Sequence, residues 1–436
     1  MSADALTGAL RSKAAATAAR TPLALFAAAA AALVLLPFVF KSGTALTIAS
    51  LMGITTIFAL SFNILLGQTG MLSFGHAVYY GLGAYMTVHA MNAVIAAKLP
   101  VPLVLMPLAG AAAGLFFAAL FGWVSTKRSG TAFAMISLGL AELVGSSSLI
   151  LRSFFGGEEG ISTDRTKLLS LFGLNFGAQV QVYYLIAFWC AVSALLMYWL
   201  TRTPIGRMCN AVRDNADRVS FVGYDPRVVR YFAFCVSGLF AGIAGGLAAV
   251  NFELANAALF SASVSGTVLL ATFLGGAGHF IGPIIGAVFV TWLQNMLSDL
   301  TEVWQLYFGL MFIAVVMIAP GGIAGLIMGH RAVWKNRTIG RLIPAYLLAL
   351  APLLLMLAGA VLAIEMAAHL TTKAADGPNM RLAGLTFSSH GWKPWLAAAA
   401  MFAAGLAGLR AALPAVSAAW DRALAGQAAA RTEGGR

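Results

Sequence analysis

The stretch that decides the fold reads TALTIASLMGITTIFALSFNILL over residues 44–66 and continues as GQTGMLSFGH over residues 67–76. Its first part contains no charged side chain and is long enough to cross a bilayer, whose hydrocarbon core needs about 20 apolar residues. Its second part brings polar side chains and three glycines directly after that apolar run. The pattern predicts a membrane-spanning helix followed by an interrupted segment.

The composition of the whole chain extends this prediction. Of 436 residues, 60% are hydrophobic and 10% are charged, against roughly 25% charged residues in soluble domains. A soluble or disordered chain is thereby excluded, and we expect an all-α polytopic bundle with about 10 core spans, some broken or re-entrant, plus about 2 extra C-terminal spans. The predicted spans are 23–40, 44–66, 71–97, 101–124, 131–151, 180–200, 230–250, 260–277, 280–298, 304–327, 342–364 and 394–412. Glycines interrupt 71–97 and 260–298, so these two regions are either full crossings or broken segments.

The distribution of charge predicts the orientation. The net charge is +12, which we assign to cytoplasmic loops under the positive-inside rule and not to nucleic-acid binding. With both termini inside, the cytoplasmic loops hold Lys127 and Arg128, then Arg202, Arg207, Arg213, Arg218 and Arg227, then Arg331, Lys335, Arg337 and Arg341. The opposite side holds 152–179, with a balanced mix of charges that includes Glu158, Glu159 and Asp164, and 299–303, with Asp299 and Glu302. We interpret 23–40 as a retained first helix and not a cleaved signal.

The chain shows no internal source of energy. It has no phosphate-binding loop, no metal-ligand spacing and no visible nucleophile triad, so we expect no enzyme, no metal and no cofactor bound by this chain. Ion-coupled carriers bury carboxylates, and only Glu142 lies well inside a predicted span. Glu142 is either held by Ser146 or a neighbouring helix, or it lies in a translocation path.

The interrupted segment is the candidate substrate path. Unwound backbone with polar side chains is tolerated at membrane depth only where it is buried or lines a cavity. The predicted lining residues are Gln68, Thr69, Ser73, Phe74 and His76. Glycines at helix-packing spacing, Gly238, Gly242 and Gly246 and then Gly282 and Gly286, are expected to let helices approach closely.

The loop 201–229 contains a predicted amphipathic helix or helix pair. Thr203 is a suitable N-cap, Pro204 a suitable first helical residue, and Gly223 a stop signal. The helix is either an ordinary interfacial helix or a docking element for a cytoplasmic ATPase. The predicted contact residues are Ile205, Arg207, Met208, Val212, Arg213, Asp214, Asp217 and Arg218.

Four ordered motifs carry a resemblance to a known family. They are Leu66–Ala77 continuing to Gly81–Tyr85, Gly130–Leu138 with Glu142, Pro204–Asn215, and Gly275–Gly278 with Gly282, Pro283, Gly286 and Ala287. Together these stretches resemble the branched-chain amino acid ABC transporter permeases of the LivM type.

The resemblance implies a permease subunit of a bacterial inner-membrane importer that forms half of a path for branched-chain or related amino acids. It implies a LivH-like second permease, two cytoplasmic ATPases that bind ATP, and a periplasmic binding protein. Thr267 stands where many members carry an acidic residue, which places it near the expected pore. Urea, short amides and other small polar solutes stay open as substrates, and an ion-coupled carrier, a passive channel or a membrane scaffold are the competing classes.

The expected domains follow from this resemblance. They are a cytoplasmic tail at 1–22, a permease domain at 23–327 that includes the coupling segment 201–229, and a C-terminal extension at 328–436 with two predicted spans. The family's core normally ends soon after residues 320–325, so the extension has no counterpart in the motifs.

Overall fold

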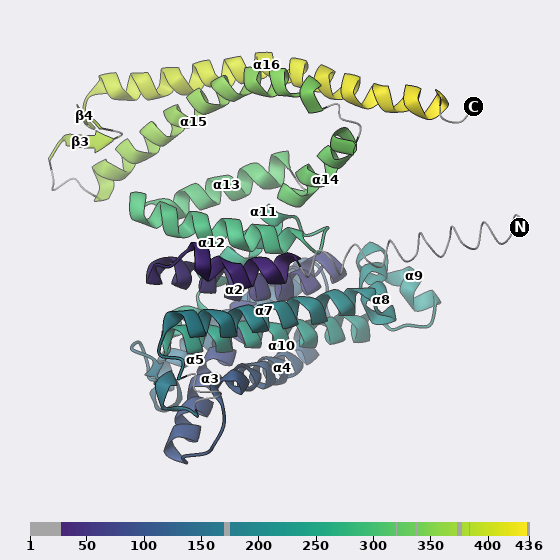
Figure 1. Ribbon diagram of the computed structural model, residues 1–436, viewed down its shortest axis with the longest axis vertical. Helices are drawn as coiled ribbons and strands as arrows, with labels where there is room; N and C mark the ends of the chain where they lie inside the picture. Colours follow the sequence, from purple (N-terminus) through teal and green to yellow (C-terminus); the bar gives the residue numbers. More distant parts are fainter. Residues whose placement is uncertain are drawn as a thin grey trace, which may run out of the picture. The chain divides into compact units, whose positions relative to one another are not determined.

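The fold is almost entirely helical, as the composition predicts. The computed structural model describes residues 28–169, 175–319, 321–335, 339–372, 377–382 and 384–433 (Figure 1). The predicted tail 1–22 and Arg337 lie outside these residues. The chain forms two compact units: residues up to 299 together with 311–325, and residues 300–310 together with 326–436. The boundaries predicted from the sequence, at 22/23 and 327/328, stay predictions.

The first unit is built from long apolar helices. After the helix Ala28–Val39, its main elements are α2 (Gly43–Asn63) with the π-helical turn η1 (Ile64–Gln68), α3 (Ala77–Ala96), α4 (Met106–Ser125), α5 (Thr131–Ile150), α7 (Gln179–Arg202), α10 (Pro226–Phe252), α11 (Ala262–Gly275) and α12 (Gly282–Leu300). Two short helices, α8 (Pro204–Asp214) and α9 (Ala216–Phe221), lie between α7 and α10. Two further helices, α13 (Trp304–Ile318) and α14 (Gly322–Lys335), pass from one unit into the other.

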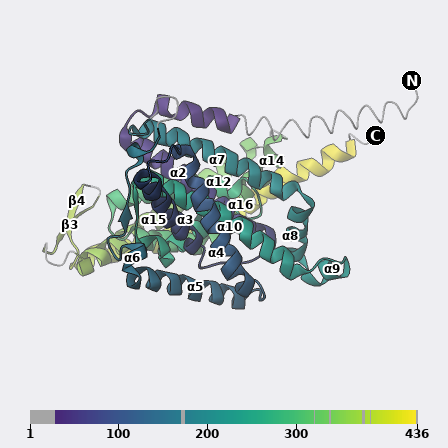
Figure 2. The same ribbon diagram turned by 90° about the horizontal axis from the view of Figure 1, so that it is seen from below.

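The core of the first unit lies where α10 packs against α3 and α4 (Figure 2). A Cβ atom added at Gly242 would lie 2.1 Å from the carbonyl oxygen of Gly110, and one at Gly238 would lie 2.3 Å from the Cβ of Ala118. A Cβ atom added at Gly246 would lie 2.7 Å from the Thr87 hydroxyl oxygen on α3. Helices come this close only where side chains are missing, which is how small residues stabilise helix pairs in lipid.

The α11–α12 pair approaches in the same way. A Cβ atom at Gly286 would lie 1.9 Å from the Ala271 carbonyl oxygen, and one at Gly282 would lie 2.0 Å from that of Gly276. Within the region 260–298 the helix stops at Gly275 and restarts at Gly282, close to the predicted boundary between 260–277 and 280–298, and whether each part crosses the membrane stays a prediction. Gly276 has a φ of +104°, which favours glycine and ends α11.

A small sheet joins two loops of the first unit. After α6 (Arg152–Phe155), strand β1 (Ile161–Ser162) pairs antiparallel with β2 (Leu254–Ala255), and Ile161 lies opposite Ala255. The loop that follows α5 is thereby held against the end of α10. These two loops must lie on the same side of the unit.

The second unit is a helical hairpin with a β-hairpin at its turn (Figure 1). Helices α15 (Ile343–Thr372) and α16 (Trp392–Glu433) pack against each other, and β3 (Asn379–Leu382) pairs antiparallel with β4 (Leu385–Ser388) between them. Gly405 permits the close contact, since a Cβ atom there would lie 2.4 Å from the Met356 nitrogen. Met366, Met380 and Ala398 form a buried cluster that fastens the β-hairpin to both helices.

The structure confirms that the chain has several helices able to span a membrane, but some of their bounds differ from the predicted ones. Seven described helices are long and apolar enough to cross a membrane, so the protein is a multi-pass membrane protein. The region predicted as 71–97 becomes helical only at Ala77, and 304–327 is a pair of helices bent by 41° and not one straight crossing. Gly322, with a φ of +61°, lies at that bend. The number of about 10 plus 2 spans stays a prediction.

Candidate functional site

The interrupted segment 67–76 begins at the end of the π-helical turn η1. The Met71 N–H donates to the Leu65 carbonyl at 3.0 Å, and Gly70 then adopts a φ of +69°. A residue with a Cβ atom is strained at such a φ, so the turn depends on glycine. The following residues run without helical structure until α3 begins at Ala77.

One side of the segment packs on α5. The Phe74 N–H donates to the Ser137 hydroxyl at 3.0 Å. A Cβ atom at Gly75 would lie 2.0 Å from the Ser137 carbonyl oxygen. The backbone of the interrupted segment therefore touches the backbone of α5, the helix that carries Glu142.

The end of the segment is held by α11. The N–H of Ala77, at the start of α3, donates to the Ser265 hydroxyl at 3.1 Å. Ser265 thus satisfies one of the N–H groups that a helix leaves unpaired at its start. Thr267, on the same helix, is half-buried, and its hydroxyl donates to the Ser263 carbonyl at 2.9 Å.

The start of the segment meets two further motifs at Gly67. A Cβ atom at Gly67 would lie 2.4 Å from the Ala277 carbonyl oxygen, in the break between α11 and α12. The Arg213 guanidinium of α8 donates to the Gly67 carbonyl oxygen. The four motifs, far apart in sequence, therefore converge on residues 67–77.

This junction contains several buried polar atoms that have no hydrogen-bond partner among the described residues. They are Asn63 Oδ1, Gln68 Oε1, Ser73 Oγ and His76 Nδ1. An unsatisfied buried polar atom costs about 1–3 kcal/mol. Four such atoms within one short stretch indicate groups that find their partners in a solute, in water or in another protein.

His76 has the most constrained position of this set. Its side chain is fully buried, stacks on Phe58 at 5.2 Å between ring centroids, and places Nε2 2.9 Å from the Ser61 hydroxyl oxygen. The Ser61 hydroxyl donates to the Phe58 carbonyl at 2.7 Å. This hydrogen bond from Ser61 favours the tautomer in which His76 Nε2 carries the imidazole proton and Nδ1 is an acceptor.

The other residues predicted for the path lie in different surroundings. The Thr69 hydroxyl is buried and donates to the Leu65 carbonyl at 2.6 Å, within its own helix. Phe74 is partly exposed. Glu142 lies on the exposed side of α5 and has no hydrogen bond or ion pair with a described residue. Among the described residues, neither Ser146 nor another helix of this chain holds this carboxylate, and the role of Glu142 stays a prediction.

Helices α8 and α9 begin with the predicted caps. The Thr203 hydroxyl accepts the Gly206 N–H at 3.2 Å, and Pro204 is the first residue of α8. The Asn215 side chain accepts the Arg218 N–H at 3.0 Å and starts α9. The segment is therefore a helix pair divided at Asn215.

One residue of α8 that was predicted to contact the ATPase lies on the inner face of the helix. Val212 is only 4% exposed and packs within this chain, so it offers no surface to a second protein, whereas Ile205 is 44% exposed. Cys209 shares the inner face with Val212, and burial raises the pKa of its thiol to about 11. Sequence analysis missed Phe221 and Val222, which are 89% and 72% exposed just before the turn at Gly223.

A groove of about 390 Å³ lies between the two short helices. Its lining includes Met208, Asp214, Arg218 and Val222. Arg207 and Asp217 are exposed nearby. Arg213 also contacts Asp214 at 3.2 Å, so its guanidinium lies between this helix pair and Gly67.

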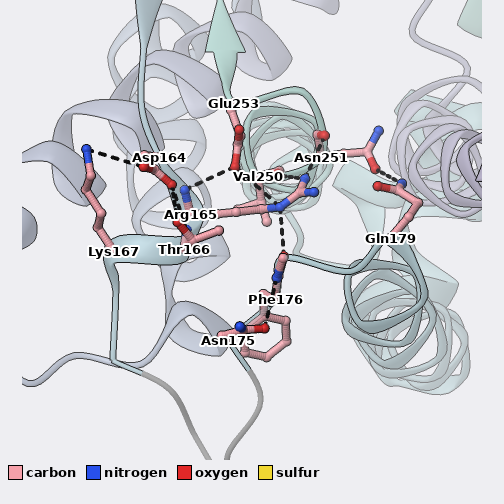
Figure 3. Close-up of polar contacts among 11 residues, drawn as sticks. Asp164, Arg165, Thr166, Lys167, Asn175, Phe176, Gln179, Val250, Asn251 and Glu253 are labelled. Atoms are coloured by element: carbon pink, nitrogen blue, oxygen red, sulfur yellow. Dashed lines mark hydrogen bonds and ion pairs between the residues drawn. The ribbon is translucent and has the colours of Figure 1, made fainter.

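The loop beyond α5 forms a polar cluster that sequence analysis did not find (Figure 3). Arg165 donates to the carbonyls of Val250 and Asn251 at 3.2 and 3.0 Å, at the end of α10, and to that of Phe176 at 2.9 Å. It also lies 3.3 Å from the Glu253 carboxylate. An arginine suits this position because the last carbonyls of a helix lack partners and carry partial negative charge.

An exposed part of the same loop is polar as well. Asp164 accepts from the Thr166 hydroxyl and N–H at 2.6 and 3.0 Å, and Lys167 lies 3.3 Å away. The hydrogen bonds from Thr166 hold the pKa of the Asp164 carboxyl below its usual value. This pair is exposed and contributes little to stability.

Comparisons with known proteins bear on the region that contains these sites. Residues 44–320 match the family described as branched-chain amino acid transport system / permease component. The chain is 29% identical over 310 residues to the high-affinity branched-chain amino acid transport system permease protein LivM of Escherichia coli (strain K12), covering 66% of this chain and 71% of that protein.

Two other relatives extend the comparison. The LivH permease protein of the same organism is 23% identical over 288 residues, which are 62% of this chain and 90% of that protein. The ribose import permease protein RbsC of Haemophilus influenzae is 30% identical over 141 residues, which are 29% of this chain and 42% of that protein. No solved structure matches the chain. The family match spans all four converging motifs, and the chain belongs to the permease components of branched-chain amino acid transport systems.

Proposed function

We propose that this protein is one of two membrane permeases in a bacterial ABC importer and that the junction at residues 67–77 lines its substrate path. The observation that carries the proposal is the convergence of four motifs, within the family-matched region, on buried polar atoms without partners. Branched-chain or related amino acids are the proposed substrates, since the matched family transports them by its description. The proposed role of this chain is transport and not catalysis.

The second permease would cover the exposed side of α5. Glu142 lies in the middle of a 20-residue apolar helix and is exposed. A carboxylate at that depth faces protein or a water-filled path and not lipid. A LivH-like partner packed along α5 would enclose Glu142 in the path between the two permeases.

The proposed orientation puts both termini, α8 and α9 in the cytoplasm. The pairing of β1 with β2 is consistent with it, because the loop after α5 and the end of α10 lie together on one side, which this orientation makes the outer side. The side chains of His89 and Asn92 on α3 also bind that loop, at the carbonyls of Phe154 and Ser162. This arrangement accommodates about 10 core spans and 2 in the extension.

Two cytoplasmic ATPases would supply the energy, and a periplasmic protein would deliver the substrate. The ATPase contact is proposed at the helix pair α8–α9, where Ile205, Phe221 and Val222 expose apolar surface. Arg207, Asp214, Asp217 and Arg218 surround it with charge of both signs. ATP binds on those partners and no cofactor binds on this chain.

Uptake by serine variants tests the path. Ser73→Ala and Ser193→Ala each remove a buried hydroxyl without a partner among the described residues, but Ser193 lies on α7 and outside the motifs that converge on residues 67–77. We expect Ser73→Ala to change the KM for leucine uptake in the assembled transporter, while Ser193→Ala leaves it unchanged.

Two outcomes would contradict the proposal. Equal KM values for both variants, at equal membrane abundance, would show that Ser73 does not face the substrate. Uptake by this chain in proteoliposomes without ATPase subunits would indicate a carrier or a channel instead.

A further inference from the structure

The C-terminal extension contains a polar cavity that lies outside the family match, which ends at residue 320. The cavity has a volume of about 300 Å³ and lies entirely within the second unit. Residues 300–303, the last turns of α15 and strand β3 line it. A volume near the lower end of small-molecule sites, about 300–1,000 Å³, selects a small ligand.

The walls of this cavity carry opposite charges that do not pair with each other. Glu365 and Arg381 both line it, yet no ion pair joins them among the described residues. Glu365 accepts one hydrogen bond, from the Tyr307 hydroxyl to Oε1 at 2.8 Å. Arg381 has no partner among the described residues. Each charged group therefore retains capacity for a ligand.

The position of Arg381 is fixed by the fold and is not that of a loose loop. Met380 beside it is buried in the cluster that fastens the β-hairpin to α15 and α16. His369 Nδ1 lies 3.0 Å from the Ser389 hydroxyl, and the Ser389 N–H donates to the Pro378 carbonyl at 2.8 Å. These contacts hold the base of the hairpin, and Met380 anchors strand β3 to α15 and α16, so the backbone that carries Arg381 is held beside α15.

The charge pattern discriminates among ligand classes. An anion meets the carboxylates of Glu302 and Glu365, and a simple cation meets Arg381, so each is repelled by one wall. No group of side chains that could hold a metal ion is found among the described residues. A zwitterion satisfies both walls, with its ammonium group at Glu365 and its carboxylate on the guanidinium, which binds carboxylates in a two-pronged geometry.

Apolar side chains complete the lining. Leu300, Val303 and Leu382 lie around the same cavity. We propose that the extension carries a binding site for a free amino acid with an aliphatic side chain, separate from the substrate path. In the proposed orientation this site faces the outside, where such solutes arrive. Its existence does not depend on the path at residues 67–77.

Calorimetric titration of the full-length chain in nanodiscs tests the site. The three probes are L-leucine, L-leucinamide, which lacks the carboxylate, and 4-methylpentanoate, which lacks the ammonium group. We expect saturable binding of L-leucine, and binding about tenfold to a hundredfold weaker for each of the other two, because each loses one charged contact.

Matched variants locate the binding. Arg381→Gln and Glu365→Gln should each weaken L-leucine binding by about tenfold or more, whereas Arg410→Gln, an exposed arginine on α16, should leave it unchanged. Arg381→Lys keeps the positive charge but loses the two-pronged guanidinium, so its affinity for L-leucine should lie between those of the wild-type chain and Arg381→Gln. Thermal unfolding of each variant checks that the hairpin stays folded.

The outcomes separate this inference from the proposed function. Unchanged L-leucine binding in both Arg381→Gln and Glu365→Gln, or no saturable binding to the wild-type chain, overturns the site. Loss of binding in these variants with leucine uptake retained supports it. Failure of the Ser73 test would leave these binding results unaffected.

Discussion

At the scale of single residues, each glycine of the interrupted segment is required for a different physical reason. Gly67 permits contact with the Ala277 carbonyl, Gly70 supplies a positive φ, and Gly75 permits contact with α5. The sequence alone does not show that these three glycines are needed for different reasons. The atoms that would surround an added Cβ, and the backbone angle at Gly70, show it.

Gly75→Ala should destabilise the protein. The added methyl group would lie 2.0 Å from the Ser137 carbonyl oxygen, and such overpacking typically costs about 1–3 kcal/mol. Gly139→Ala is the matched control, because Gly139 lies on α5 with open space around its Cβ position. Thermal unfolding of the two purified variants measures the difference. A Gly75→Ala protein as stable as the Gly139→Ala protein would refute the close contact.

Arg165→Ala should destabilise the outer loop. The change removes the donors that satisfy the end carbonyls of α10 and leaves Glu253 without its cation. Hydrogen bonds that involve a charged group contribute about 1.5–3 kcal/mol, so we expect a loss of about 2–3 kcal/mol.

The control is Lys167→Ala, which breaks an exposed ion pair that contributes little to stability. Thermal unfolding of the two purified variants reports both effects. Similar loss in the two variants would mean that Arg165 does not cap α10.

At the scale of elements, the sequence predicted what depends on near neighbours. The start of α8 could be predicted because Thr203 and Pro204 act within one helical turn. The interruption after η1 could be predicted because glycines and polar residues follow one another. The Arg165 cap could not, since its carbonyl partners lie 85 and 86 residues away. The inward position of Val212 depends on how α8 packs against the first unit and was likewise missed.

Arg213 connects two of these elements, and its substitution should separate docking from coupling. In Arg213→Gln the helix pair keeps its exposed apolar residues, so the ATPase should still co-purify. The guanidinium bond to Gly67 is lost, so substrate-stimulated hydrolysis should fall by about tenfold, as expected for one charged hydrogen bond.

Two further variants serve as controls for this result. Phe221→Asp places charge on the exposed surface and should release the ATPase. Arg128→Gln alters a different loop predicted to be cytoplasmic and should affect neither measurement. Full coupling in Arg213→Gln would show that the Gly67 contact transmits nothing.

At the scale of the whole molecule, the family match and the compact units divide the chain at nearby positions. The match ends at residue 320, and the last segment of the first unit ends at Gly325. The four motifs lie before this point, whereas the cavity with Glu365 and Arg381 lies in the second unit. Transport and amino-acid binding by the extension should therefore be separable.

A chain that ends at Gly325 should test this separation. It keeps residues 67–77, α8, α9 and the cap formed by Arg165, so it should insert, bind its ATPase and retain uptake. It loses the hydrogen bond between Tyr307 and Glu365, which should lower the unfolding temperature by several degrees. L-leucine binding attributed to the extension should disappear. Uptake lost at normal membrane abundance would show instead that the extension belongs to the pathway, because the transport residues would then be intact but insufficient.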